Sequence, residues 1–284
     1  MPVSDLADAL RLEQTGPTTY RADNYEMGER GVVFGGQLIG QLIAAGALVD
    51  ESKTVKSAHA IFARPVMVAE PVELRIDVLQ AGRTFASANT SIWQGDKERA
   101  RAMILLSADE PDLIRHAVAM PNVPGPDDVA PMSPANPDAR VVGDVDILDA
   151  DATGEPEIDV WWRRSGGVDC DQRVAIGQGL LAHASATFLI GAAMRPHAGV
   201  GQSAAHAAFS TGIIGHTISF HEPIDVAAWH LLCHRSRYTG RGRAYGMGEV
   251  FDAAGQLVAS FSQESMVRHF PEGVSPDGQE STIL

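Results

Sequence analysis

The stretch Val33-Phe34-Gly35-Gly36-Gln37-Leu38-Ile39-Gly40-Gln41 opens the part of the sequence that decides the fold. No charged residue falls between Arg30 and Asp50, and a helix that is apolar on all sides must be buried. A second uncharged run spans Val174–Met194. Polar Gly, Gln, Ser, Thr and His residues interrupt these runs, so we expect two buried core helices and no membrane insertion.

Segments rich in β-forming residues follow each apolar run. Residues 55–62, 72–79, 84–93 and 99–107 come after the first run, and residues 72–79 alternate apolar and charged side chains with a period of two. Residues 212–220, 230–237, 243–251 and 257–267 come after the second run. Each half of the chain therefore predicts one buried helix and several antiparallel strands.

The two halves share a spaced motif. Phe62-x-x-Pro65 corresponds to Phe220-x-x-Pro223, and a Gly-Arg pair follows each proline after 17 residues, as Gly82-Arg83 and Gly240-Arg241. Two matches in register indicate duplication. A long antiparallel sheet curled around one helix is a hotdog unit. We predict an α+β double hotdog with two antiparallel sheets, each wrapped around a buried central helix; two unrelated α+β domains are the alternative.

Prolines and aspartates gather between the two halves. Eight of the 16 prolines lie between residues 111 and 156, and proline disfavours both helices and central strands. We therefore expect an N-terminal hotdog over 1–110, a Pro/Asp-rich linker over 111–160, a C-terminal hotdog over 161–270 and a disordered tail over 271–284.

The formal net charge of −14 disfavours nonspecific binding to nucleic acid or to an anionic membrane. An anionic substrate then needs a local cluster of arginine or lysine. The two cysteines, Cys170 and Cys233, have no metal-ligand spacing, so we expect no metal site and no disulfide. Since the N-terminus shows no signal-peptide pattern, we expect a cytoplasmic protein.

Several motifs resemble the acyl-CoA thioesterase II family (TesB-like), and the similarity runs from about residue 5 to 268 apart from the linker. The resemblance implies a double hotdog that hydrolyses acyl-CoA to free fatty acid and coenzyme A without a cofactor, as a dimer or tetramer. The motifs are the opening stretch, 59–65, Gly82-Arg83-Thr84-Phe85, 215–223, Gly240-Arg241-Gly242 and 257–264.

The resemblance also implies three groups that activate water: an Asp, a Thr or Ser, and a Gln. The family's Gln is present as Gln263, but the Asp position falls on Ala186 and the Thr position on Ile213. No Asp or Glu lies from Val174 through Phe220. A small shift of the alignment therefore does not restore the carboxylate.

Two nearby side chains could replace the missing groups. His183 lies one helical turn before Ala186, and its imidazole can act as a base near neutral pH. Thr211 lies two residues before Ile213, on the same face of the expected strand. We take Gln263, Thr211 and His183 as candidate catalytic residues, with a structural role as the alternative for each; His59 and His216 are expected to be structural or to line a tunnel.

The substrate needs an oxyanion site, an acyl site and a phosphate site. Gly35 and Gly36 open a helix whose backbone N–H groups can bind an oxyanion. Phe62, Leu38 and Leu42 are expected to line the pocket that holds the acyl chain. Arg64 and Arg241 are the named candidates for the phosphates of coenzyme A, and the other candidates are Arg163, Arg164, Arg243 and Arg268.

Three functional hypotheses remain open from the sequence. The first is an acyl-CoA thioesterase with an altered water-activating site. The second is a non-catalytic protein that binds acyl-CoA or another acyl ligand, because two of the family's catalytic groups are absent. The third is a hotdog hydratase or dehydratase, which ranks low because His183 and His216 have no nearby Asp partner. Neither a Gly-x-Ser-x-Gly motif nor a phosphate-binding loop occurs.

Overall fold

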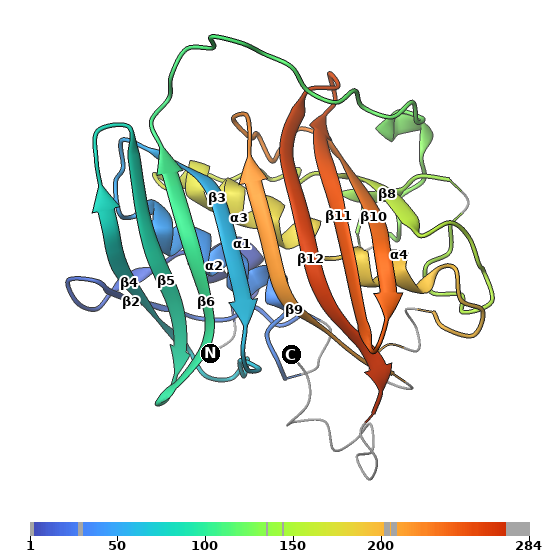
Figure 1. Cartoon of the computed structure of the whole chain (residues 1–284), viewed down its shortest axis with the longest axis horizontal. Helices are drawn as coiled ribbons and strands as arrows, with labels where there is room; N and C mark the ends of the chain where they lie inside the picture. Colours follow the sequence, from blue (N-terminus) through green and yellow to red (C-terminus); the bar gives the residue numbers. More distant parts are fainter. Residues whose placement is uncertain are drawn as a thin grey trace.

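The computed structural model describes residues 3–27, 31–134, 136–143, 145–201, 205 and 209–270; the predicted tail over 271–284 lies outside them. One antiparallel sheet of 12 strands forms the framework, with the strand order β1-β2-β4-β5-β6-β3-β9-β12-β11-β10-β8-β7. The helices lie behind this sheet in the view of Figure 1.

The elements divide into two halves. The first half contains α1 (Leu6–Ala9), β1 (Glu13–Gln14), β2 (Thr19–Ala22), α2 (Gly35–Ala47), β3 (Thr54–Phe62), β4 (Val72–Ala81), β5 (Phe85–Gln94) and β6 (Lys97–Ser107). The second contains the 3-10 helix η1 (Pro126–Asp128), β7 (Ala139–Val141), β8 (Glu157–Trp162), α3 (Arg173–Ser185), α4 (Leu189–Met194), β9 (Phe209–Phe220), β10 (His230–Gly240), β11 (Arg243–Asp252) and β12 (Leu257–His269).

The strand order confirms the predicted double hotdog. From the middle of the sheet outward, β3, β6, β5, β4 and β2 correspond to β9, β12, β11, β10 and β8. The two predicted sheets join edge to edge where β3 pairs with β9 and His59 lies opposite Thr217. These two residues are separated by the same interval as Phe62 and Phe220, so the dyad that relates the halves passes between them.

The two central helices cross through a pair of glycines. A Cβ atom on Gly40 would lie 3.0 Å from the Gly179 carbonyl oxygen, and one on Gly179 would lie 3.1 Å from the Gly40 carbonyl oxygen. A Cβ on Gly36 would lie 3.0 Å from the His183 carbonyl oxygen. Since the start of α2 meets the end of α3, the helices run antiparallel. Apolar side chains of both helices pack against the sheet in one large core, while Ile176 and Leu180 of α3 belong to a smaller cluster with Ala7 and Leu10.

Gly40→Ala should therefore destabilise the fold. Helix propensity alone would favour alanine by up to about 1 kcal/mol, but the new methyl group must push apart two backbones that already touch. We expect a net loss of about 1–3 kcal/mol in the free energy of unfolding, the usual range for overpacking, measured by urea denaturation. Gly177→Ala is the control, because its Cβ would meet only Val226 at 3.7 Å and should stabilise α3. Equal gains in both variants would contradict the prediction.

The second apolar run, predicted as one helix over 174–194, forms two helices. It breaks after Ser185 and restarts at Leu189. The Ser185 Oγ lies 2.9 Å from the Ala182 carbonyl oxygen, and the Thr187 hydroxyl donates to the His183 carbonyl oxygen at 3.2 Å. Side-chain hydroxyls thus occupy carbonyls at the helix end. Residues 173–194 have the length and composition of a membrane span, but 72% of the apolar window is buried inside the molecule, as in a core helix.

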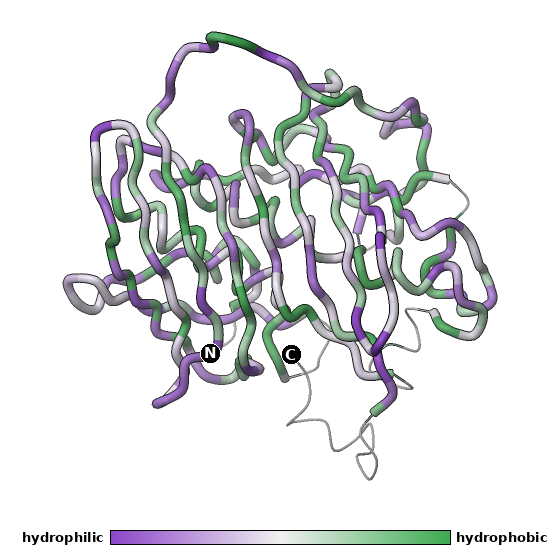
Figure 2. The backbone as a smooth tube through the Cα atoms, viewed as in Figure 1, coloured by the Kyte–Doolittle hydropathy of each residue, from purple (hydrophilic) through white to green (hydrophobic). Residues whose placement is uncertain are grey.

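The segment over 111–160 holds more regular structure than its composition indicated. It contains η1 and β7, and β8 begins within it. The Trp161 Nε1–H donates to the Pro124 carbonyl oxygen at 2.8 Å, and Arg140 lies over the ring of Trp229. Long-range contacts of this kind override the local preference of a proline-rich sequence. Its first part, the connection after β6, is the most exposed, and Leu113 in it is 95% exposed. Hydrophilic and hydrophobic stretches alternate along this connection in Figure 2.

Candidate active site

The start of α2 forms one side of the candidate active site. A Cβ atom on Gly35 would lie 3.4 Å from the Ile213 Cβ and 3.8 Å from the Phe62 ring. Gly36 approaches the His183 backbone in the same way. The structure therefore brings together Gly35, Gly36, Phe62, Ile213 and the end of α3, which the sequence analysis had named separately.

A chain of four buried polar side chains lies between the end of α3 and the sheet. The Ser185 Oγ is 3.0 Å from the His216 Nε2, and the His216 Nδ1 is 3.1 Å from the Gln263 Oε1. The Gln263 Nε2 donates to the Ser265 Oγ at 3.0 Å. Each of the four residues is at most 2% exposed, so water cannot replace these hydrogen bonds, and the Gln263 amide is held from both ends.

A β-bulge sets which residues of β9 face this chain. On β12, Gln263 pairs with His216, but Ser265 pairs with Ile213. Two residues of β12 thus match three of β9, because Ile214 is the extra residue. The bulge turns Ile213 toward the helices, next to Ser265 and under the start of α2. An apolar side chain occupies the position where the family resemblance implies a hydroxyl.

Two buried imidazoles share this region. Burial lowers the pKa of His216 to about 4, against its hydrogen bond with Gln263, which raises it. Burial likewise lowers the pKa of His234 to about 4. The ring of Phe261 lies 6.0 Å from that of His216 and 5.2 Å from that of His234. Both histidines are therefore neutral at pH 7, and an aromatic ring separates them.

His183 lies beside this chain and does not join it. Its ring meets the edge of Phe34 with 5.2 Å between ring centroids, and its Nε2 is buried without a hydrogen-bond partner among the residues described. Desolvation lowers the pKa of His183 to about 4. The residue as a whole is half-buried, in contrast to the buried Gln263 and Thr211, although the Nε2 atom itself is covered.

Thr211 lies farther along β9. It is buried and pairs with Val267, four residues beyond Gln263 on β12. At about 3.3 Å per residue this places the two backbones about 13 Å apart. One water molecule does not bridge that distance. The three candidate catalytic residues are therefore not gathered around a single point.

The arginines named from the sequence divide into two groups. Arg163 pairs with Asp138 at 3.0 Å and Arg164 with Asp5 at 2.7 Å, while Arg64 is exposed and donates to the Glu98 carbonyl oxygen. No carboxylate lies within ion-pair distance of the other three in the part of the chain described; these are Arg241, Arg243 and Arg268.

The three unpaired arginines lie at one end of the sheet. Arg241 and Gly242 both have positive φ, 54° and 72°, as a type I′ turn between β10 and β11 requires. Arg243 pairs with Met266 on β12, and Arg268 is three residues beyond Ser265. Arg268 is thus about 10 Å along the strand from the bulge. Arg241, Arg243 and Arg268 therefore place more positive charge at this end of the sheet than Arg64 places at its own position.

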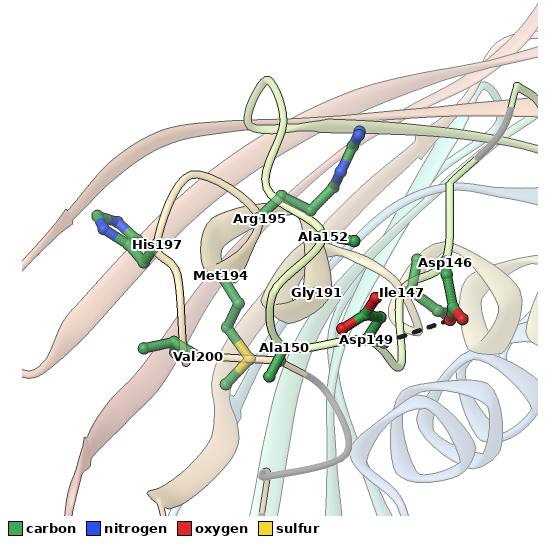
Figure 3. Close-up of a pocket in the computed structure, with 11 residues that line it drawn as sticks. Asp146, Ile147, Asp149, Ala150, Ala152, Gly191, Met194, Arg195, His197 and Val200 are labelled. Carbon is green, nitrogen blue, oxygen red and sulfur yellow. Dashed lines mark hydrogen bonds between the residues drawn. The ribbon is translucent and has the colours of Figure 1, made fainter.

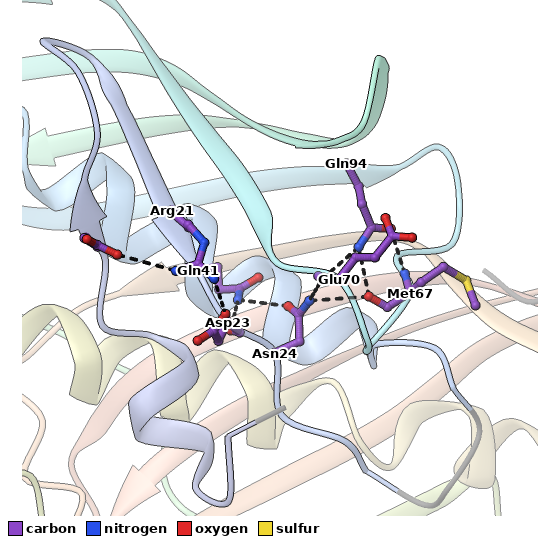
Figure 4. A network of polar contacts seen from close by, with 8 residues as sticks. Arg21, Asp23, Asn24, Gln41, Met67, Glu70 and Gln94 are labelled. Atoms are coloured by element: carbon purple, nitrogen blue, oxygen red, sulfur yellow. Dashed lines mark hydrogen bonds and ion pairs between the residues drawn. The ribbon is translucent and has the colours of Figure 1, made fainter. Parts of the chain in front are cut away.

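The glutamines of the opening motif hold the loops around α2, and Figure 4 shows the part of this network around Gln41, Asn24 and Gln94. Asn24 Oδ1 accepts from Gln37 Nε2 at 3.1 Å, and the Asn24 amide donates to the Glu70 carbonyl oxygen at 2.7 Å. Gln41 Nε2 donates to the Ala9 carbonyl oxygen at 3.0 Å. Gln94 binds the same 67–70 turn. The two glutamines of the opening motif therefore have a structural role, because they tie the neighbouring loops to α2.

A separate surface hollow lies beside α4 (Figure 3). It encloses about 240 Å³, part of it open to solvent, and none of the sequence-predicted site residues lines it. The hollow is lined by Asp146, Ile147, Asp149, Ala150, Ala152, Gly191, Met194, Arg195, His197, Val200 and Gly201.

No group of three or more His, Cys, Asp or Glu in the described part of the chain could hold a metal ion.

The sequence does not reveal the link between Ser185, His216 and Ser265 through Gln263. It predicts only a structural or tunnel-lining His216 at a strand start. Its spacing from Ile218 and Phe220 on β9 does place it on the buried face, because side chains two apart share a face. That signal gives burial but not the partner, which depends on the register between β9 and β12.

Comparison with known proteins gives the family. Residues 24–107 match the acyl-CoA thioesterase N-terminal domain, and residues 115–267 match the acyl-CoA thioesterase C-terminal domain. Acyl-CoA thioesterase 2 of Haemophilus influenzae is 27% identical over 286 residues, covering 94% of this chain and 98% of that protein.

Two solved structures have the same architecture. An acyl-CoA thioesterase II, TesB2, from Mycobacterium marinum has a TM-score of 0.78 and 26% identity, covering 95% of this chain and all (100%) of that chain. A tesB protein from Mycobacterium avium subspecies paratuberculosis has a TM-score of 0.77 and 23% identity, covering 92% and 98%. Since the matched domains cover most of the sequence, this chain belongs to the acyl-CoA thioesterase family, in its TesB-like thioesterase II branch.

Proposed function

We propose that this protein hydrolyses fatty acyl-CoA to free fatty acid and coenzyme A with a non-standard catalytic site. The observation that carries the proposal is the Gln263 amide, which two hydrogen bonds hold in place and which His216 links to the end of α3, where the start of α2 meets that helix. A fixed amide can orient a water or polarise a thioester without reorganising during the reaction. Family membership supports the choice of substrate. Assembly into dimers or tetramers and a cytoplasmic location stay predictions.

The start of α2 supplies the oxyanion site in this proposal. The N–H groups of Gln37 and Leu38 already bond to the Phe34 carbonyl oxygen, whereas those of Gly35 and Gly36 precede the first intrahelical bonds. The helix dipole adds positive potential at the same place. The thioester oxygen, which gains negative charge on attack, would lie against these two N–H groups.

His183 takes the place of the missing carboxylate. With its pKa lowered to about 4, the imidazole is neutral at pH 7 and has about the basicity of an aspartate. It can therefore accept a hydrogen bond from water in a site that holds no acid. Thr211 is the weakest of the three candidates, because of its separation from Gln263.

Arg241, Arg243 and Arg268 are the proposed phosphate site. Their replacement by alanine should raise the KM for acyl-CoA about tenfold, equivalent to about 1.4 kcal/mol, and leave kcat nearly unchanged. The effect should shrink at high salt because exposed charges are screened. Arg75→Ala is the control, since Arg75 lies over Trp93 and pairs with Glu73 on β4. A kcat loss at constant KM would contradict this assignment.

A non-catalytic acyl-CoA binding protein is the second candidate. Ala186 and Ile213 are both buried and apolar at the positions where the resemblance implies a carboxylate and a hydroxyl. An apolar site of this kind favours an acyl chain and gives no help to water. The hydratase hypothesis has no such support, because no acidic residue adjoins His183 or His216 in the described contacts.

One pair of measurements separates the two candidates. Purified protein is incubated with acyl-CoA of several chain lengths, and thiol release is followed alongside calorimetric titration with the same ligands. Turnover above that of the Gln263→Ala variant supports hydrolysis. Saturable binding without thiol release supports the binding protein, and neither signal with any chain length rejects both.

A further inference from the structure

The hydrogen bonds of Gln263 account for all but one of its polar groups. A glutamine amide has one acceptor oxygen and two N–H donors. The oxygen faces the His216 Nδ1 at 3.1 Å, and one N–H donates to the Ser265 Oγ at 3.0 Å. One N–H is left over. Its direction depends on which way the amide faces, because the Ser265 hydroxyl can donate or accept and the role of the His216 Nδ1 depends on which ring nitrogen carries the proton.

The orientation of the Gln263 amide and the position of the His216 proton depend on each other. For the Gln263 oxygen to accept, the His216 Nδ1 must carry the proton, and a neutral imidazole then has a lone pair on Nε2. The Ser185 hydroxyl has one proton and two acceptors within reach, the Ala182 carbonyl oxygen at 2.9 Å and this Nε2 at 3.0 Å, and in this tautomer it donates to Nε2. With the amide turned over, the proton would be on Nε2 and the Gln263 oxygen would face Ser265. The position of one proton therefore reports the orientation of the amide.

We propose that His216 is a positioning residue, which together with Ser185 fixes the orientation of the Gln263 amide so that its remaining N–H points in one direction, where it binds the substrate or the attacking water. The inference rests on the proposed function, in which Gln263 contacts the reacting groups. The Ser185 hydroxyl lies between the His216 Nε2 and the Ala182 carbonyl oxygen, so in this scheme it acts on the histidine and not on the thioester. No covalent acyl-serine forms in this scheme.

Two substitutions of His216 separate a positioning role from a purely structural one. In His216→Asn, the side-chain amide reaches the place of the ring Nδ1 and can still donate to Gln263. In His216→Gln, the longer amide reaches the place of Nε2, keeps Ser185 and leaves Gln263 without its partner. Both variants lose the ring that stacks on Phe261, so they are matched in lost packing.

We expect kcat to fall about 100-fold in His216→Gln, the lower end of the effect of losing an aligned donor in an oxyanion site. It should fall less than about tenfold in His216→Asn, with KM little changed in both. Folded fraction is checked by circular dichroism before each assay. Equal losses in the two variants, or a change in KM alone, would overturn the inference.

The imidazole proton provides a readout that does not depend on activity. Long-range proton–nitrogen NMR of the full chain with labelled histidine should place the His216 proton on Nδ1. In Gln263→Ala, that resonance should shift, because its acceptor is gone. A proton on Nε2 in the unmodified protein overturns the inference whatever the activity. If the unmodified protein releases no thiol, the proposed function fails, while the NMR result still decides the orientation of the amide.

Discussion

We expect the replacement of Gln263 by alanine to lower kcat for acyl-CoA hydrolysis by about 100- to 1000-fold. This is the range for removing one fixed hydrogen-bond donor from an oxyanion-type site. KM should change little, since the amide acts on the reacting centre and the arginines at the far end of β12 bind the phosphates. The measurement is initial-rate thiol release at saturating acyl-CoA.

The loss must be separated from instability. Gln263→Ala leaves the His216 Nδ1 and the Ser265 hydroxyl without their partner, and unpaired buried groups cost about 1–3 kcal/mol each. Assays at a temperature well below the unfolding midpoint keep the folded fraction constant. Gln256→Ala is the matched control, because Gln256 is exposed on the same β11–β12 hairpin. A variant at Gln263 that keeps more than about a tenth of the activity would assign hydrolysis to another group.

The fold could be predicted from the sequence because its signals are local and repeated. Uncharged helices and period-two strands each report burial within a few residues, and two copies of one spacing report duplication. The break at Ala186 was missed, because hydroxyls that cap a helix end look like ordinary polar residues in a run. The strand β8 was hidden in a proline-rich segment, where only its pairing with β10 reveals it.

The site was harder to predict because its contacts depend on register. Gln263 and His216 are far apart in sequence, and a one-residue bulge at Ile214 decides which side chains of β9 face Gln263. Departures at Ala186 and Ile213 are visible in the sequence, but what fills their place is not. Gly35 and Phe62 were named for the oxyanion and acyl sites, and their packing against Ile213 is a property of the assembled core.

Acid should destabilise the protein well before its carboxylates are protonated. His216 and His234 have folded-state pKa values lowered by burial to about 4, while an unfolded histidine has a pKa near 6.5. The unfolded state therefore binds more protons between these values. The stabilisation is complete above about pH 6.5 and is lost as the pH falls toward 4. At pH 5 each histidine costs about 2 kcal/mol relative to pH 8.

Urea denaturation between pH 5 and pH 8 measures this effect. A loss of about 4 kcal/mol for the pair is a large share of the usual 5–15 kcal/mol of a folded domain. His234→Asn keeps a donor toward the Ile158 carbonyl oxygen, which His234 Nδ1 contacts at 3.2 Å, but removes one titrating group. The slope of the unfolding free energy near pH 5.5 should then fall by about 1.4 kcal/mol per pH unit. His59→Asn is the control at an exposed position. If the slope in His234→Asn were unchanged, the His234 imidazole would have to be charged in the folded protein. Burial disfavours that charge, because His234 is 0% exposed and has no carboxylate partner among its described hydrogen bonds.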